Sequence, residues 1–154
     1  MQQLLAGSFH LCGGGFFGVS LNFQRNMFAD THLRSGKSQL VQAVFNLLDN
    51  AVKYSPHSTS VSVSTGITDG RLRIEVRDEG PGIPAAELPR LFERFYRVDK
   101  ARSREQGGTG LGLAIVRHIA EVHGGRAGVE SWEGEGSLFW IELPTTMVTP
   151  LDPT

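Results

Sequence analysis

The spacing of apolar side chains along the chain predicts several short strands. Apolar and polar residues alternate from Phe17 to Phe23, which is typical of a strand with one buried face. Arg71–Val76 shows the same period, and Asp69-Gly70 just before it is a hairpin signal. Strands are expected in this way at Phe17–Phe23, from Val61 onward, at Arg71–Val76, at Arg126–Trp132 and at Ser137–Leu143. The last two enclose a turn at Glu133–Gly136 and predict a closing hairpin.

A helical spacing of apolar residues occurs in two segments. The first is expected from about Gln39 to Tyr54, with Ser38 as its N-cap and Ser55-Pro56 as its end. The second is expected over Leu111–His123, where Gly124-Gly125 ends the helix. Because strand pairs and helices are mixed, the order favours an α+β fold, a two-layer sandwich. Its sheet would be mixed but mostly antiparallel, with the helices on one face.

The remaining segments lack a sustained period. Pro84–Phe95 predicts short helical turns, and Val98–Gly108 is charged, polar and glycine-ended, which favours a mobile loop. Asn26–Lys37 predicts a loop with at most a short strand. Residues from Pro144 onward predict a frayed tail.

Composition narrows the class of protein. The chain has 154 residues, which suits one domain, and 40% hydrophobic with 20% charged residues is typical of a globular protein. A net charge of −1 gives no sign of a nucleic-acid partner. Cys12 is the only cysteine, so no internal disulfide is possible. Residues 1–24 carry no charged side chain, yet their glycines, glutamines and lack of a basic start argue against a membrane span.

The first predicted helix carries an unusual polar stripe, formed by Gln39, Gln42, Asn46, Asn50 and Lys53. Asparagine is a poor residue for a helix interior, because its side chain competes for backbone hydrogen bonds. One explanation is a solvated face. The other is a set of neutral oxygen ligands for Mg²⁺ with one ammonium group for a phosphate.

Two glycine segments follow this helix. In DEGPGIP, Asp78 ends a strand, where its carboxylate can accept a hydrogen bond from an exocyclic amine such as N6 of adenine. Gly80 and Gly82 would let the backbone approach a ligand closely, although an ordinary turn explains them too. In GGTGLGLAIV, the glycines lead into a helix whose free N–H groups favour phosphate, although a hinge is the simpler alternative. This second segment has neither the Walker pattern nor a Rossmann turn.

Four motifs in this order resemble the N box, first glycine box, F box and second glycine box of sensor histidine kinases. They are NLLDNAVKYSP, DEGPGIP, LFERFYR and GGTGLGLAIVRHIAEVHGG. The resemblance covers about Val19 to Pro144 and implies a catalytic ATP-binding domain with the Bergerat fold, shared with DNA gyrase and related ATPases. It divides the chain into a lead-in at 1–16, the catalytic domain at 17–144 and a tail at 145–154.

The resemblance also implies site residues. On the N box, Asn50 would be the Mg²⁺ ligand assisted by Asn46, Lys53 would contact phosphate, and Tyr54 would line the nucleotide pocket. In the first glycine box, Asp78 would bind adenine, Gly80 and Gly82 would allow close approach, and Ile83 would pack near the base. In the F box, Phe92 and Phe95 would be the aromatics that anchor a lid. The phosphate-binding end of the lid and the helix after it would comprise Gly108, Thr109, Gly110, Leu111 and Gly112.

Four cations lie in the expected lid: Arg97, Lys100, Arg102 and Arg104. One of them is expected to touch the γ-phosphate, and a solvated charge run is the alternative explanation for each. Gyrase-type relatives have a glutamate general base where this chain has Asn46. Because an amide cannot take a proton from water at neutral pH, the chain should bind ATP and hydrolyse it poorly alone.

The expected function is transfer of the γ-phosphoryl group of ATP to a histidine on a separate helical phosphoacceptor domain. A response regulator would act downstream. The acceptor motif is absent from this chain, and His10 lacks the acidic neighbour that the motif requires. The resemblance implies a cytoplasmic domain that itself contacts neither nucleic acid nor membrane. The alternatives are an ATP-sensing module without kinase activity, an anti-sigma-type protein-serine kinase, which generally lacks the F box, and a gyrase-like hydrolase.

Overall fold

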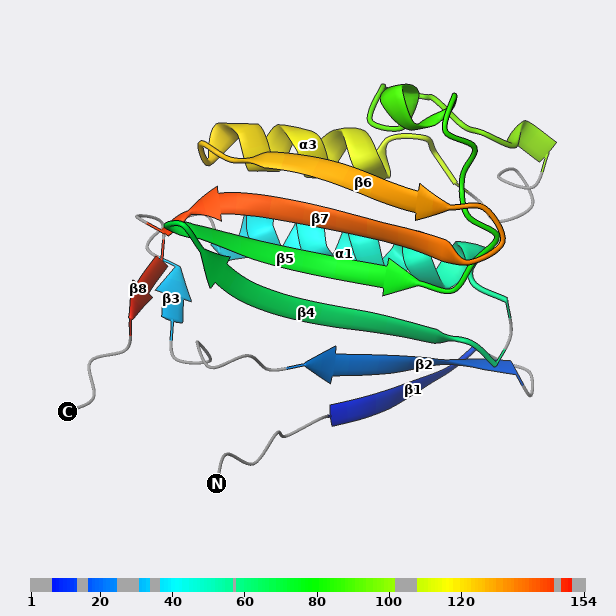
Figure 1. The fold of residues 1–154 in the computed structure, drawn as a ribbon, viewed down its shortest axis with the longest axis horizontal. Helices are drawn as coiled ribbons and strands as arrows, with labels where there is room; N and C mark the ends of the chain where they lie inside the picture. The colour runs from blue at the N-terminus through cyan, green and yellow to red at the C-terminus, as the bar shows by residue number, and fades with distance from the viewer. Residues whose placement is uncertain are drawn as a thin grey trace.

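The structure, a computed structural model, describes residues 7–13, 17–24, 31–33, 37–56, 58–101, 108–145 and 148–150. Its main layer is a six-stranded sheet in the order β1-β2-β4-β5-β7-β6, and two helices cover one face (Figure 1). The elements are β1 (Gly7–Gly13), β2 (Phe17–Gln24), β3 (Thr31–Leu33), α1 (Lys37–Tyr54), β4 (Ser60–Thr68), β5 (Arg71–Asp78), the 3₁₀ turn η1 (Leu88–Arg90), α3 (Gly112–Val122), β6 (Arg126–Trp132), β7 (Gly136–Pro144) and β8 (Val148–Pro150). The α+β prediction is confirmed.

One parallel strand pair gives the sheet its mixed character. β2 runs parallel to β4, with Leu21 opposite Val61, whereas the other neighbours in the sheet are antiparallel. Parallel neighbours need a crossover connection, and α1 supplies it across one face of the sheet. The predicted hairpin turn between β4 and β5 is confirmed, because Asp69 and Gly70 both have positive φ, 50° and 69°.

The hydrophobic core lies between the helices and the sheet. Along β7, inward-facing Phe139, Ile141 and Leu143 are at most 1% exposed, as the alternating pattern predicts. From α1 the core receives Leu40, Ala43, Leu47 and Ala51, and from α3 it receives Val116, Ile119 and Ala120. None of the helices in the described residues is both long and apolar enough to cross a membrane.

The opposite face of the sheet carries charges arranged around a tryptophan. The Arg73 guanidinium lies 4.5 Å from the centre of the Trp140 ring and bonds to Glu75 at 2.6 Å and Glu142 at 3.1 Å. Arg126 bonds to the same Glu142 at 2.7 Å, and this hydrogen bond holds the pKa of Glu142 below its usual range. Paired charges therefore cover the face that lacks helices.

Three sequence expectations were wrong at the edges of the fold. α1 begins at Lys37, so Ser38 lies within its first turn and is not the N-cap. Residues 148–150 of the expected tail form β8, which pairs with β3, and residues 7–13 of the expected lead-in form β1, which pairs with β2. β8 pairs with β3, which is remote in the sequence, so no hairpin signal marks it. β1 pairs with β2, the next strand along the chain, but the glycines at both of its ends weaken the strand signal. Residues 102–107 of the expected loop lie outside the described residues.

Replacing Leu47 with alanine should destabilise the fold by about 3 kcal/mol, because it removes a fully buried side chain between helix and sheet. Val41→Ala is the matched control on the same helix. Its side chain is 61% exposed, so we expect a change of less than about 0.5 kcal/mol. Urea unfolding of both variants measures the difference, and equal midpoints would contradict the packing described here.

Candidate functional site

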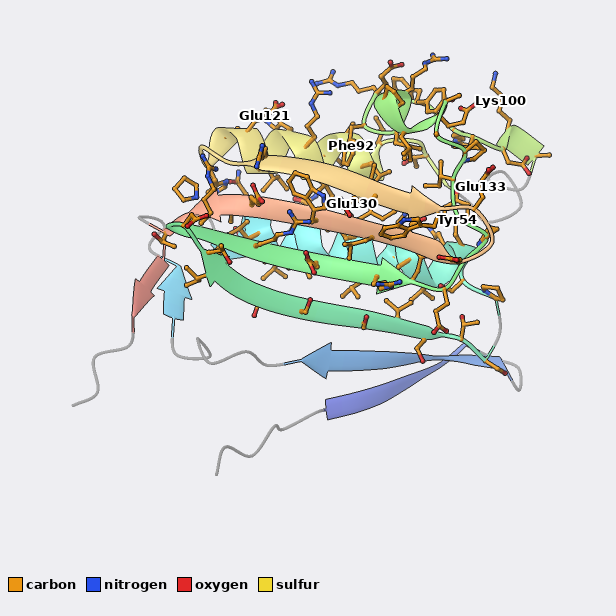
Figure 2. All side chains as sticks on the ribbon, viewed as in Figure 1. Tyr54, Phe92, Lys100, Glu121, Glu130 and Glu133 are labelled. Carbon is orange, nitrogen blue, oxygen red and sulfur yellow. The ribbon has the colours of Figure 1, made fainter. Side chains whose placement is uncertain are left out.

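A cavity of about 520 Å³ lies between α1, the loop after β5 and the start of α3. Tyr54, labelled in Figure 2, marks the end of α1 that borders it. The lining residues are Asn46, Asp49, Asn50, Lys53, Tyr54, Asp78, Pro81, Gly82, Ile83, Leu91, Tyr96, Arg97, Val98, Asp99, Gly108, Thr109, Gly110, Gly112, Leu113, Ile115, Ser137 and Phe139. Both glycine segments and the amide stripe therefore meet at one site.

Most of the residues implied by the resemblance line this cavity. They are Asn46, Asn50, Lys53, Tyr54, Asp78, Gly82, Ile83, Gly108, Thr109, Gly110 and Gly112. Gly80, Phe92, Phe95 and Leu111 do not line it. Of the lid cations, Arg97 lines the cavity, whereas Lys100 does not and points away from the sheet in Figure 2. Arg102 and Arg104 lie outside the described residues. The ligand roles of all these residues stay predictions.

The C-terminal part of the polar stripe of α1, formed by Asn46, Asn50 and Lys53, lines one wall of the cavity. The Asn46 Nδ2 donates to the Gly112 carbonyl at 3.4 Å, which connects α1 to the first turn of α3. Asn50 makes no side-chain hydrogen bond within the described residues, so its amide is available to a ligand. Lys53 forms an ion pair with Asp49 at 2.8 Å. Sequence reasoning missed Asp49, although its spacing of four residues from Lys53 is the signal for such a pair.

Asp78 is a buried carboxyl group at the far wall, only 4% exposed. Its Oδ1 accepts hydrogen bonds from the Gly80 N–H at 2.9 Å and the Ser137 N–H at 3.2 Å. Its Oδ2 has no partner among the described residues, yet it is not among their fully buried unpaired atoms, so it faces the open cavity. Burial raises the pKa of Asp78, and the two N–H donors oppose this rise.

The glycines of the first segment are required by the protein's own backbone. A Cβ on Gly80 would lie 2.8 Å from the Tyr54 carbonyl oxygen. Gly82 has φ +74°, and a Cβ there would lie 2.2 Å from the Trp132 carbonyl oxygen. We expected both glycines to let the backbone approach a ligand closely. Gly80 instead packs against the end of α1 and does not line the cavity, so ligand contact does not explain that glycine.

A backbone hydrogen bond joins the F box to the second glycine segment. The Phe95 N–H donates to the Gly110 carbonyl at 2.8 Å. Gly110 has φ +74°, and a Cβ there would lie 2.9 Å from the Phe95 Cα and 3.4 Å from the Arg97 Nε. Phe92 packs edge-on against Phe139 with ring centres 6.5 Å apart. The expectation that the Phe95 ring also anchors this region is wrong, because that side chain is 71% exposed.

α3 begins beside the cavity without a side-chain cap. Its N-cap residue is Leu111, and Gly112 and Leu113 of its first turn line the cavity. The first N–H groups of a helix lack intrahelical partners, and with the helix dipole they favour an anion. The described residues contain no cluster of three or more His, Cys, Asp or Glu that would hold a metal ion.

Residues 36–147 match the family described as histidine kinase-, DNA gyrase B-, and HSP90-like ATPase. The match covers more than half of the chain, and the chain belongs to this family. The resemblance to the catalytic ATP-binding domain of sensor histidine kinases is thereby confirmed.

Individual relatives agree with this assignment. The chain is 51% identical over 105 residues to the sensor-like histidine kinase SenX3 of Mycolicibacterium smegmatis, covering 68% of this chain and 27% of that protein. It is 41% identical over 127 residues to the sensor histidine kinase WalK of Bacillus subtilis, covering 80% of this chain and 21% of that protein. The chain thus spans about a quarter of the length of these curated relatives.

Solved structures confirm the fold. The mycobacterial sensor histidine kinase MprB is 32% identical with a TM-score of 0.64, covering 88% of this chain and 79% of that one. Full-length ShkA, solved in complex with AMPPNP, is 33% identical with a TM-score of 0.66, covering 79% of this chain and 24% of that one.

We expect Asp78→Asn to stabilise the ligand-free protein at pH 8. The amide oxygen can still accept from Gly80 and Ser137, while the cost of a buried charge disappears. Because the folded-state pKa of Asp78 is raised, the wild type loses stability as pH rises from the ordinary carboxyl range through that raised value. The advantage of the variant should therefore shrink as pH falls through the same window. Urea unfolding at several pH values tests this, and parallel stability curves would contradict it.

Proposed function

We propose that the chain is the ATP–Mg²⁺-binding catalytic domain of a sensor histidine kinase. It transfers the γ-phosphoryl group of ATP to a histidine on a separate helical phosphoacceptor domain. The observation that carries this proposal is that Asn46 and Asn50 of α1, Asp78 and the second glycine segment all line one cavity. Membership of the ATPase family and similarity to sensor histidine kinases support it. Residues 17–144 would form the catalytic domain.

The nucleotide would lie with its base at Asp78. The open Oδ2 is an acceptor suited to the N6 amine of adenine, and Ile83 contributes an apolar wall beside it. The phosphates would extend between the α1 stripe and the start of α3, where backbone N–H groups favour negative charge. Lys53, oriented by its ion pair with Asp49, would meet a phosphate oxygen.

The donor set fits a magnesium ion bound together with phosphates. Mg²⁺ prefers oxygen ligands and usually keeps several waters and substrate phosphates in its shell. Asn50 would supply an amide oxygen, and Asn46 would assist because its Nδ2 already donates to Gly112, leaving its oxygen for the cavity. When bound, the ion neutralises phosphate charge and orients the γ-phosphoryl group for in-line transfer.

Arg97 is the lid cation that we assign to the γ-phosphate. Of the two lid cations within the described residues, Arg97 lines the cavity and Lys100 does not. The Arg97 guanidinium lies beside Gly110. A positive group at this position would stabilise the charge that develops on the transferring phosphoryl group. Asn46 provides no general base for water, and Asp49 is already paired with Lys53. This arrangement favours transfer to a docked acceptor over hydrolysis.

The surface beside the lid is suited to bind a partner helix that carries acidic side chains. A hollow of about 300 Å³ is lined there by Arg90, Arg94, Arg97 and Lys100, by Glu93, which pairs with Arg90, and by Tyr96 and Phe95, the latter 71% exposed. An exposed aromatic ring among several cations suits an amphipathic acidic helix. The phosphoacceptor domain would dock here, and a response regulator would then receive the phosphoryl group.

Two rival functions make different predictions for one experiment. With labelled ATP and the helical phosphoacceptor domain of a related sensor kinase added in trans, our proposal expects acid-labile label on that domain. An ATP-sensing module would bind ATP and transfer nothing, and an anti-sigma-type kinase would give acid-stable phosphoserine.

Asn50→Ala should lower the affinity for ATP by about tenfold in the presence of Mg²⁺ and leave the fold intact, since one metal ligand is lost. Without Mg²⁺, the variant and the wild type should bind ATP alike. Gln42→Ala is the control, because Gln42 is an exposed residue of the same helix that does not line the cavity. Calorimetric titration measures both, and unchanged Mg²⁺-dependent affinity would remove Asn50 from its assigned role.

Arg97→Ala should slow phosphoryl transfer by about a hundredfold or more, while ATP affinity changes by less than about tenfold, because the charge acts mainly in the transition state. Arg71→Ala is the matched control, since Arg71 is exposed on β5 and does not line the cavity. Single-turnover transfer to the helical domain separates the two effects. Equal losses in binding and transfer would argue against this role for Arg97.

A further inference from the structure

Asp49 and Lys53 form a salt bridge on the α1 wall of the cavity, where the phosphates of the proposed ligand would lie. The Lys53 Nζ and the Asp49 Oδ2 are 2.8 Å apart, and both residues line the cavity. Their side chains are 34% and 45% exposed, so the pair is accessible to solvent. The positive charge that a phosphate would meet at Lys53 is therefore largely offset by the carboxylate beside it.

The other charged residues of the cavity wall supply no surplus of positive charge. Among the described residues, the charged ones that line the cavity are Asp49, Lys53, Asp78, Arg97 and Asp99. Even with Asp78 assigned to the base end, two cations then stand against two carboxylates. A nucleoside triphosphate carries about two fewer negative charges as its Mg²⁺ complex than without a metal. A wall without net positive charge suits the complex better than the metal-free anion.

We propose that Asp49 is a specificity-determining residue that makes the site selective for metal-bound over metal-free nucleoside triphosphates. Its carboxylate repels the phosphates of a metal-free nucleotide and offsets their attraction to Lys53. A divalent ion bound to the phosphates weakens this repulsion, because it lowers the negative charge that approaches the wall. The proposal rests on the proposed function, since it assumes that a triphosphate lies along this part of α1.

A purely structural role for Asp49 would be to orient Lys53, and it requires a different property of the side chain. Orientation needs an acceptor for the Lys53 ammonium group, whereas selectivity needs a negative charge. Asparagine at position 49 keeps an acceptor of nearly the same size and removes the charge. A residue that only orients Lys53 would therefore leave the affinity for both forms of the nucleotide unchanged, or weaken both, in Asp49→Asn.

The experiment measures the affinity for ATP by calorimetric titration, once with excess Mg²⁺ and once with excess EDTA. We expect the wild type to bind the Mg²⁺ complex more tightly, and Asp49→Asn to bind metal-free ATP about tenfold more tightly than the wild type does. The affinity for the Mg²⁺ complex should rise by only about threefold, because the complex carries about half the charge. The preference for the complex thus falls by about threefold. Added salt should reduce these gains, because it screens the charges of a solvent-accessible pair.

Two further variants serve as controls. Asp49→Glu keeps both the negative charge and the spacing of four residues from Lys53, so the preference of the wild type should remain. Asp69→Asn removes the same charge from the turn between β4 and β5, outside the cavity lining. Asp69 has φ 50°, a conformation that asparagine tolerates, so this variant should bind both forms as the wild type does.

Each outcome decides for or against the inference. Tighter binding of metal-free ATP in Asp49→Asn, with neither control changed, supports it. Metal-free affinity that is unchanged or lower in Asp49→Asn overturns it while the proposed function stands, and so does an equal gain in Asp69→Asn. A wild type that binds metal-free ATP as tightly as the Mg²⁺ complex also overturns it. A wild type that binds ATP under neither condition overturns the inference and the proposed function together.

Discussion

A buried carboxyl group organises this site. Asp78 lies at the end of β5, and one of its oxygens accepts hydrogen bonds from the Gly80 and Ser137 backbones. These two bonds join the first glycine segment to the start of β7, 59 residues further along the chain. The same burial that raises the pKa of Asp78 leaves its second oxygen facing the cavity. A buried charge without a ligand lowers the stability of the folded protein, and such a loss of stability is common at binding sites.

The β6–β7 hairpin holds the loop that carries this base-binding wall. Gly134 bonds to the Pro81 carbonyl, Ser131 bonds to the Ile83 N–H, and Gly82 passes directly under the Trp132 carbonyl. The loop therefore has little freedom to shift, although it has no regular secondary structure. A rigid support of this kind lowers the cost of ordering a ligand, because the binding groups are already in position.

α1 serves the core and the cavity at once. Leu47 and Ala51 are fully buried against the sheet, while Asn46 and Asn50, on the adjoining face of the helix, line the cavity. The position of the amides is thus determined by core packing rather than by a loop. The family assignment is consistent with this arrangement, since the matched region begins at residue 36, one residue before the helix.

The sequence by itself determined both helices, the strands of the central sheet and the segments that line the cavity. Each of these depends on a period or a motif contained within one stretch of chain, such as the amide stripe or DEGPGIP. Tertiary structure alone decided that β1 and β8 are strands, that Arg97 and not Lys100 lines the cavity, that Asp49 lines it too, and that Ser131 bonds to the loop beside it. Partners such as Ile83 and Ser131 are 48 residues apart, and a single hydroxyl in a strand has no local pattern. Only the packing of remote backbones brings such groups within hydrogen-bonding distance.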